Sequence, residues 1–500
     1  MLLSCSHVGN EKRAVDDRLP DPVIKAGIAR LDGKITNFHL KQGDEIPTLT
    51  LHVPHPVTGD VAILKAHLNE DGTFHYEVPV ESNITIGSIG SDIFKSSISV
   101  SLAANEESKL EIIYDETGKF KATVVNKPEL TSDDMITLGD MMGKMLDHQS
   151  PERIPRYNML IEDFVPYELK SLERKLNIAK NDSILSGRAK NYITNEFKLI
   201  YLSVRFFRYI EIMKNDFMRY NKEKRRDDFN PHEPGKSYYA FLKYFNLNDP
   251  QYLYNGTYSE VLQAILSNQT LNIPAIKDTP VKDWLEEVKT NMADLVGSDT
   301  GLFYELLAAN AYVRQFNNGS KPLSDKQIEN IRSYFRNVEI TKILLEKNVE
   351  VTKLDEEKKH SDAIINKTPV VPKEALMKAI ISRYKGKAVL VDFWATWCMP
   401  CMNAMNETKI VKTEMHDKKI AFVYITNASS PRELWEEKIK LIGGEHYYLT
   451  QEEWEYLLDS FGFSGIPTYL FYDKKGELKN KVTAYPGTEK MQKMIGELLL

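Results

Sequence analysis

The segment VDFWATWCMPC at residues 391–401 carries most of what this 500-residue sequence says about fold and function. An apolar, strand-like run leads into the pair Cys398 and Cys401, and a helical pattern follows the pair. Only a thiolate attacks a disulfide, and a helix N-terminus stabilises a thiolate through unpaired backbone N–H groups and the helix dipole. We therefore expect Cys398 to attack a substrate disulfide and Cys401, one turn later, to resolve the mixed disulfide.

The sequence around this pair alternates between strand-like and helical stretches. Such alternation predicts βαβ units and a central sheet with helices on its faces. The expected strands are residues 388–393, 420–425, 446–449 and 468–472, and the expected helices are 400–416, 431–442 and 451–461.

Two motifs of this region resemble the thioredoxin superfamily. The run WATWCMPC at residues 394–401 is most similar to its TlpA/ResA-like branch of thiol-disulfide oxidoreductases, and FGFSGIPTYLFYDKKG at 461–476 resembles the segment that carries the superfamily's cis-proline. The resemblance covers residues 375–500 and implies an α/β thioredoxin-like fold there. It also implies that the bond between Ile466 and Pro467 is cis and faces the cysteine pair, and that a substrate chain pairs beside it as an extra strand.

The resemblance also suggests roles for Asp392 and Trp397. Asp392 stands at the position before the cysteine pair where thioredoxins carry a buried acid. Burial in an apolar strand would raise the pKa of its carboxyl, and its inferred role is to take the proton from Cys401. The alternative is an acid at a strand end that reaches solvent. Trp397 is expected either to give the substrate an apolar edge or simply to pack. The lysine that thioredoxins carry near the acid has no counterpart, because Thr426 and Asn427 stand there.

The remainder of the chain is expected to form two further domains. Short strand-like runs with Asp-Gly and Thr-Gly turns predict an all-β sandwich at residues 21–127, and apolar residues at helical spacing predict an α-helical domain at 128–353. Residues 1–20 are interpreted as an N-terminal tail. A polar run predicts a linker at 354–374, which precedes the thioredoxin-like domain at 375–500.

Local patterns in the helical region predict finer detail. Ser324 and Gln327 fit a capping box at a helix start, and Thr279 followed by Pro280 fits an N-cap with proline at the first helical position. Aromatic residues between positions 192 and 217 could line a ligand groove, but their helical spacing is first of all typical of a packed core.

Composition and charge exclude several classes of protein. Lys and Arg total 65 against 71 Asp and Glu, a net charge of −6, which lacks the basic footprint of a nucleic-acid-binding protein. Three cysteines exclude a disulfide-stapled scaffold and a Cys-only zinc site. We expect no cofactor, because the cysteine pair itself carries the electrons. Four scattered histidines do not predict a metal site: His52, His55, His67 and His75.

The first residues, Met1-Leu2-Leu3-Ser4-Cys5, resemble the end of a bacterial lipoprotein signal, in which the cysteine becomes the lipidated first residue. On this hypothesis Cys5 is the membrane anchor, and the protein faces the periplasm in the cell envelope, like Bacteroidetes-type multidomain envelope proteins. The alternative is an ordinary cytosolic N-terminus with an incidental cysteine. No apolar run reaches the ~18 residues that span a bilayer, so a lipid anchor is the only membrane attachment that we expect.

Together these features predict a protein-disulfide reductase, a thiol-disulfide oxidoreductase that acts on protein thiols and disulfides of the envelope. It would receive electrons from a membrane thiol donor. The dipeptide Met399-Pro400 between the cysteines carries neither histidine nor charge, which favours a less oxidising couple. Two alternatives remain: a disulfide isomerase, or a protein that binds an envelope partner or ligand and uses its cysteine pair as a redox switch.

Overall fold

The structure is a computed structural model that describes residues 17–38, 46–124, 129–147, 154–222, 224, 228–317, 321–415, 418–463 and 465–499. Cys5, the expected lipidation site, lies outside the described residues. By its contacts the chain divides into two compact units. The first unit comprises Met1–Arg314 and Leu323–Lys347, and the second comprises Gln315–Pro322 and Asn348–Leu500. The domain boundaries expected from the sequence remain predictions.

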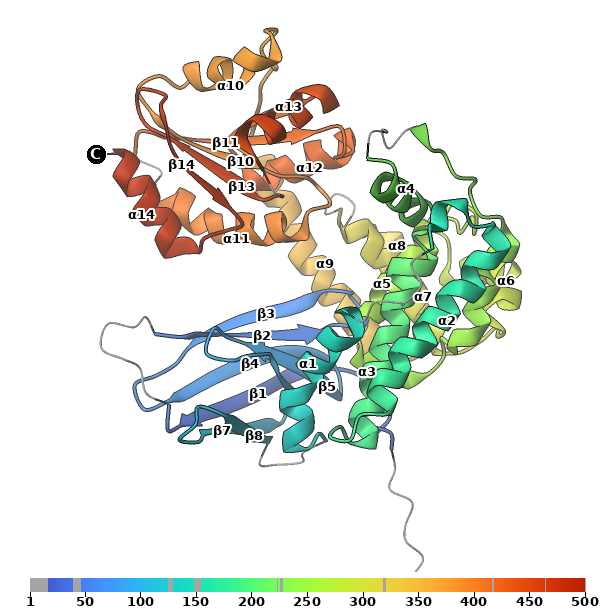
Figure 1. The fold of residues 1–500 in the computed structure, drawn as a ribbon. Coiled ribbons are helices and arrows are strands. Elements are labelled where there is room, and N and C mark those ends of the chain that lie inside the picture. The colour runs from blue at the N-terminus through green and yellow to red at the C-terminus, as the bar shows by residue number, and fades with distance from the viewer. Residues whose placement is uncertain are drawn as a thin grey trace, which may run out of the picture. The chain divides into compact units, whose positions relative to one another are not determined.

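In its described N-terminal part, the first unit contains two four-stranded sheets (Figure 1). One sheet has the order β4-β1-β7-β8 and the other β3-β2-β5-β6; the strands are β1 (Ile24–Thr36), β2 (Thr48–Pro54), β3 (Val61–His67), β4 (Thr73–Ser82), β5 (Ile84–Gly90), β6 (Ile98–Ala103), β7 (Glu107–Tyr114) and β8 (Phe120–Val124). Buried and exposed residues alternate along β7, as in a strand with one face on a core. The Tyr76 hydroxyl of β4 donates to the Leu49 carbonyl of β2 at 2.8 Å and links the sheets. The expected all-β sandwich is confirmed.

The middle of the chain is helical, as the sequence predicts (Figure 1). Helix α9 begins in the first unit and ends in the second. The helices are α1 (Ser132–Asp147), η1 (Arg156–Asn158), α2 (Ile161–Lys180), α3 (Gly187–Ile200), η2 (Tyr201–Phe206), α4 (Tyr209–Tyr220), η4 (Lys236–Phe245), η5 (Pro250–Tyr254), α5 (Thr257–Ser267), α6 (Val281–Val296), α7 (Leu302–Asn317), α8 (Asp325–Tyr334) and α9 (Val338–Lys359).

The aromatic-rich run between α3 and α4 forms core rather than a groove. Phe197, Tyr201 and Phe206 are almost completely buried, and the ring of Phe206 stacks on Phe241 with their centroids 4.8 Å apart. This packing supports the core interpretation. The periodicity does not predict that η2 is π-helical and breaks the regular α-helix between α3 and α4.

The two predicted helix starts have different outcomes. The Ser324 hydroxyl accepts from the Gln327 N–H at 3.1 Å, and the Gln327 side chain accepts from the Ser324 N–H at 2.9 Å, which confirms the capping box of α8. The N-cap expected at Thr279 is wrong. Pro280 keeps an extended backbone with ψ 135°, so α6 begins one residue later and Pro280 is its N-cap.

The second unit contains a sheet of six described strands in the order β14-β13-β10-β11-β12-β9. On one face α10 and α13 pack against Val389, Val391 and Phe393, and on the other α11 and α14 pack against Ala388 and Leu390. The strands are β9 (Ile364–Ile365), β10 (Ala388–Phe393), β11 (Ile420–Asn427), β12 (Glu445–Leu449), β13 (Thr468–Tyr472) and β14 (Leu478–Thr483). The helices are α10 (Lys373–Ser382), α11 (Met399–Glu414), α12 (Arg432–Ile442), α13 (Gln451–Phe461) and α14 (Thr488–Leu499).

The segment interpreted as a linker, residues 354–374, contains regular structure. Its charged residues pair one turn apart, Lys358 with Asp355 at 3.6 Å and Lys359 with Glu356 at 2.6 Å, and such pairs support the helix rather than a loop. Helix α9 therefore continues to Lys359. Farther along, β9 pairs in parallel with β12 and adds an edge strand to the sheet.

Candidate active site

Strand β10 delivers the cysteine pair to one edge of the sheet. Every residue of β10 is buried, and the strand runs parallel to β11 and antiparallel to β13. After Phe393 the chain leaves the sheet through the buried residues Trp394 and Ala395. Helix α11 then begins at Met399 with Cys398 as its N-cap, so the local sequence of strand, short loop and helix places Cys398 at a helix N-terminus.

Cys398 and Cys401 form a disulfide with an S–S distance of 2.00 Å. The Sγ atom of Cys398 also accepts a hydrogen bond from the backbone N–H of Cys401 at 3.2 Å. A donor of this kind stabilises a thiolate at a helix N-terminus. Pro400 lies in the first turn, where its missing N–H removes no intrahelical bond. Cys398 is 4% exposed and Cys401 fully buried, so Cys398 is the more accessible sulfur.

The bond between Ile466 and Pro467 is cis, as the resemblance implies. The carbonyl oxygen of Ile466 lies 3.8 Å from the Sγ atom of Cys398. Strand β13 begins at Thr468, whose hydroxyl donates to the Gly465 carbonyl at 2.6 Å and fixes the turn before the strand. The backbone of Ile466 is therefore next to the sulfur that a substrate would meet.

Trp397 lies at the surface beside the cysteines. Its side chain is 64% exposed, and its indole N–H donates to the Ser429 hydroxyl at 3.1 Å. The neighbouring Met399 is 68% exposed. These two apolar side chains agree with an apolar edge at the site, and they contradict the alternative that Trp397 packs inside.

A polar run at the end of β11 anchors the loop before the cysteines, and the sequence patterns did not predict this role. The backbone N–H of Thr396 donates to the Ser430 hydroxyl at 3.0 Å, which lies 2.8 Å from the Thr426 hydroxyl. Ser429, which receives the indole N–H, donates to the Asn427 side chain at 2.7 Å. Of these residues, Thr426 and Asn427 stand where the resemblance to thioredoxins would place a lysine. The available signal was the place of Thr426 and Asn427 directly after the strand expected at residues 420–425.

Asp392 is a buried acid. It is 4% exposed, and burial raises the pKa of its carboxyl to about 8, so it holds a proton at neutral pH. Its direct partners across the sheet are Tyr424 of β11 and Tyr469 of β13. Among the described residues, neither Asp392 Oδ1 nor the Tyr469 hydroxyl has a hydrogen-bond partner. The alternative of a solvent-exposed strand-end acid is therefore wrong.

The described ranges contain no cluster of metal-ligating side chains. Within these ranges, no three His, Cys, Asp or Glu side chains come together as a metal site. Three of the scattered histidines have other contacts: His75 lies 2.6 Å from Asp32, His55 lies 2.9 Å from the Pro79 carbonyl, and His67 lies 3.4 Å from the Thr48 hydroxyl. The chemistry available here is thiol–disulfide exchange beside a carboxyl group that can exchange a proton near neutral pH.

Comparison with known proteins places this region in a family. Residues 386–478 match the family model for thioredoxin-like proteins. Thiol-disulfide oxidoreductase ResA of Geobacillus kaustophilus is 30% identical over 106 residues, which are 21% of this chain and 58% of that protein. Thioredoxin-like protein YneN of Bacillus subtilis is 30% identical over 109 residues, 21% of this chain and 60% of that protein. The chain thus spans less than two thirds of these relatives. The solved structure of a thioredoxin-family thiol:disulfide interchange protein of Chlorobium tepidum is 24% identical in sequence. The match covers 24% of this chain and 84% of that chain, with a TM-score of 0.22.

Residues 386–478 are therefore a thioredoxin-like domain at the C-terminal end of a longer chain. Within that class, the domain is related to the ResA/TlpA-type thiol-disulfide oxidoreductases.

The raised pKa of Asp392 predicts a pH-dependent stability. In the oxidised protein the cysteines do not titrate, while the Asp392 carboxyl titrates near 8 when folded and near its usual 3.8 when unfolded. The protonated Asp392 carboxyl therefore contributes fully to the unfolding free energy below pH 4, and this contribution is lost as the pH rises to about 8. The unfolding free energy of Asp392→Asn relative to wild type should therefore rise across this window, by at most about 1.4 kcal/mol per pH unit.

Urea unfolding followed by tryptophan fluorescence measures this difference, because four of the five tryptophans lie in the second unit. Asp459→Asn, at an exposed position of α13, is the matched control and should show no such slope. Parallel pH curves for wild type and Asp392→Asn would contradict the prediction.

Proposed function

We propose that this protein is a thiol-disulfide oxidoreductase that acts on protein disulfides through Cys398 and Cys401, and that it works as a reductase. One observation carries the proposal: the disulfide begins helix α11 and lies 3.8 Å from the carbonyl of the cis Ile466–Pro467 peptide. This arrangement combines a stabilised attacking sulfur with an adjacent stretch of backbone that can hold a substrate chain.

The reaction begins with the reduced pair. The Cys398 thiolate attacks one sulfur of the substrate disulfide, which forms a mixed disulfide and releases one substrate thiolate. With a pKa of about 8, a minor fraction of Asp392 is ionised at neutral pH, and this ionised form takes the proton of Cys401. The Cys401 thiolate then attacks the Sγ atom of Cys398. The second substrate thiol leaves, the Cys398–Cys401 disulfide forms, and two electrons have moved from the pair to the substrate. The raised pKa of Asp392 suits a group that exchanges a proton near neutral pH.

Three residues are proposed to hold the substrate. The exposed indole of Trp397 offers an apolar edge, and its bond to Ser429 fixes its orientation. The backbone beside Ile466 and Pro467 pairs with an extended substrate chain by β-augmentation. Backbone pairing selects no side chain, so this mode suits a range of protein disulfides.

The oxidised pair must be reduced again after each cycle, and we propose a membrane thiol protein as the donor. A location in the cell envelope, facing the periplasm, agrees with such a donor and with the lipoprotein-like residues before Cys5. In the described part of the chain, no helix is long and apolar enough to cross a membrane. Fractionation of cells that express the native gene checks this location.

Substitution of each cysteine tests the proposal. In an insulin reduction assay with dithiothreitol as donor, Cys398→Ser should fall to background, because no attacking thiolate remains. Cys401→Ser should instead accumulate a mixed disulfide with the substrate, visible on a non-reducing gel. The matched control is Cys5→Ser, which should keep full activity. Equal activity of wild type and Cys398→Ser would refute the proposed function.

Asp392→Asn tests the proton transfer. The variant should slow resolution of the mixed disulfide by about 100-fold, the range of general base catalysis, and leave the first attack by Cys398 largely unchanged. Stopped-flow measurements with a fluorescent disulfide peptide separate the two steps. Asp459→Asn again serves as control. Equal slowing of both steps would contradict the role of Asp392 and leave the cysteine chemistry intact.

The reduction potential of the pair separates a reductase from an isomerase. Equilibration of the full chain in dithiothreitol or glutathione buffers should give a value below about −230 mV, in the reductase range. The reason is the dipeptide Met399-Pro400, which adds no charge or histidine to stabilise the Cys398 thiolate. A value above about −180 mV would instead assign the protein to isomerases or oxidases.

A further inference from the structure

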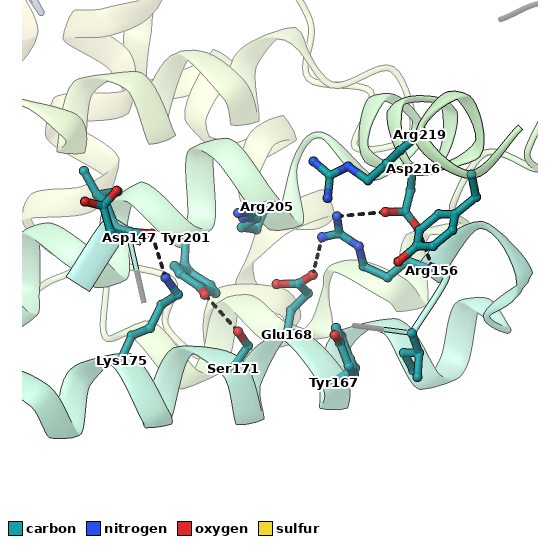
Figure 2. Close-up of a pocket in the computed structure, with 13 residues that line it drawn as sticks. Asp147, Arg156, Tyr167, Glu168, Ser171, Lys175, Tyr201, Arg205, Asp216 and Arg219 are labelled. Carbon is teal, nitrogen blue, oxygen red and sulfur yellow. Dashed lines mark hydrogen bonds and ion pairs between the residues drawn. The ribbon is translucent and has the colours of Figure 1, made fainter. Parts of the chain in front are cut away.

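The first unit contains a cavity of about 380 Å³ that is lined mainly by charged and hydroxyl-bearing side chains (Figure 2). Its wall is formed by the end of α1, by η1, by one face of α2, by the π-helical turn η2 and by α4. On α2 the lining residues Glu168, Ser171 and Lys175 are three and four positions apart, so they share a face. The volume falls within the range of small-molecule sites.

An ionic network forms one side of the cavity. Arg156 contacts Glu168 at 3.1 Å and Asp216 at 3.3 Å, and its backbone N–H donates to Asp216 at 2.5 Å (Figure 2). Both carboxylate side chains are only 3% exposed. The two acids of this network are thus occupied by Arg156, and the network holds η1 against α2 and α4.

Lys175 adds a nearly buried cation to the wall. Its Nζ donates to the carbonyls of Met145 at 2.6 Å and Leu146 at 3.0 Å, which closes the end of α1. Burial lowers the pKa of Lys175, and the positive charge of Arg205 lowers it further, while Asp147 acts in the opposite direction.

Two arginines of the lining have no acid of their own. Among the described residues, neither Arg205 nor Arg219 forms an ion pair or a side-chain hydrogen bond. Arg205 is half-buried, and its guanidinium lies 6.0 Å from the ring centroid of Tyr201, whose hydroxyl lies 3.1 Å from that of Ser171. Both Tyr201 and Arg205 belong to the π-helical turn, a rare geometry that occurs frequently at functional sites.

We propose that this cavity binds a small anionic ligand, whose carboxylate or phosphate group is held by the guanidinium groups of Arg205 and Arg219. Guanidinium forks match both kinds of oxyanion and bind them in two-pronged fashion. Arg156 offsets one of the two negative charges of Glu168 and Asp216. With Asp147, Lys175, Arg205 and Arg219 included, the charged lining residues are four cations and three acids, so a net positive charge remains for an anion. The proposal concerns the first unit alone and does not depend on the thiol chemistry of Cys398 and Cys401.

Titration calorimetry of the full chain tests the site. The probes are inorganic phosphate in one arm and succinate in the other, each against sodium chloride of equal ionic strength. Arg205→Gln and Arg219→Gln should each weaken binding of the effective probe about tenfold or more, because each removes a charge-assisted hydrogen bond. Arg208→Gln is the matched control: this arginine follows the same turn, is 58% exposed and pairs with Glu211.

Each outcome decides the proposal. The proposal is supported if Arg205→Gln and Arg219→Gln weaken binding and Arg208→Gln leaves it unchanged. The probe that gives a binding heat, inorganic phosphate or succinate, shows whether the site takes a phosphate or a carboxylate. Binding of neither probe, or equal weakening by all three variants, overturns it, since the latter would indicate general charge attraction. Arg219 is exposed and has no ion-pair partner among the described residues, so Arg219→Gln keeps the test valid even where Arg205→Gln fails to fold.

Discussion

The pairing of β10 with its two neighbours is the constraint on which the candidate active site depends. Because β10 and β13 are antiparallel with Phe393 opposite Thr468, the end of one and the start of the other lie at the same edge of the sheet. The chain leaves β10 toward Cys398 and enters β13 through Pro467, so strand pairing brings the helix N-terminus to the cis peptide. Parallel pairing with β11 brings the polar end of that strand to the same edge. A slip of one residue would turn Asp392 to the opposite face of the sheet.

Asp392 is a local conflict in an otherwise consistent strand. On the same face, Ala388 and Leu390 pack into an apolar cluster with α11 and α14, whereas a carboxyl at the next position loses its hydration. The strand tolerates the acid because the carboxyl stays neutral up to about pH 8. Selection for stability alone would favour an apolar residue at this position. Departures of this kind from local consistency concentrate at functional sites, which agrees with the proposed role of Asp392 as a proton acceptor.

The parts of the fold that could be predicted are those with local signals. Short apolar strands, helices between them and the capping box at Ser324 are all visible within a few residues, and the cis bond at Pro467 followed from a family motif. Contacts between distant residues have no such signal: Thr396 meets Ser430 across 34 positions. The charged run that ends at Lys359 has the composition of a linker, but it is helical, with ion pairs one turn apart that support the helix. Likewise, the π-helical turn after Ile200 leaves no trace in the apolar periodicity.

The cysteine pair belongs to the second unit, and the first unit contains a buried ionic cluster of its own. The side chains of Glu168 and Asp216 are almost completely buried, and both form ion pairs with Arg156. Replacement of such a buried ionic cluster by apolar side chains of similar volume is often neutral or stabilising, so stability does not account for it. The network does keep the wall of the cavity polar, because it is costly to bury charged side chains among apolar neighbours. The guanidinium groups of Arg205 and Arg219 have no acid partner in the described part of the chain, and they give the first unit a binding chemistry of its own, which is distinct from the disulfide chemistry of the second.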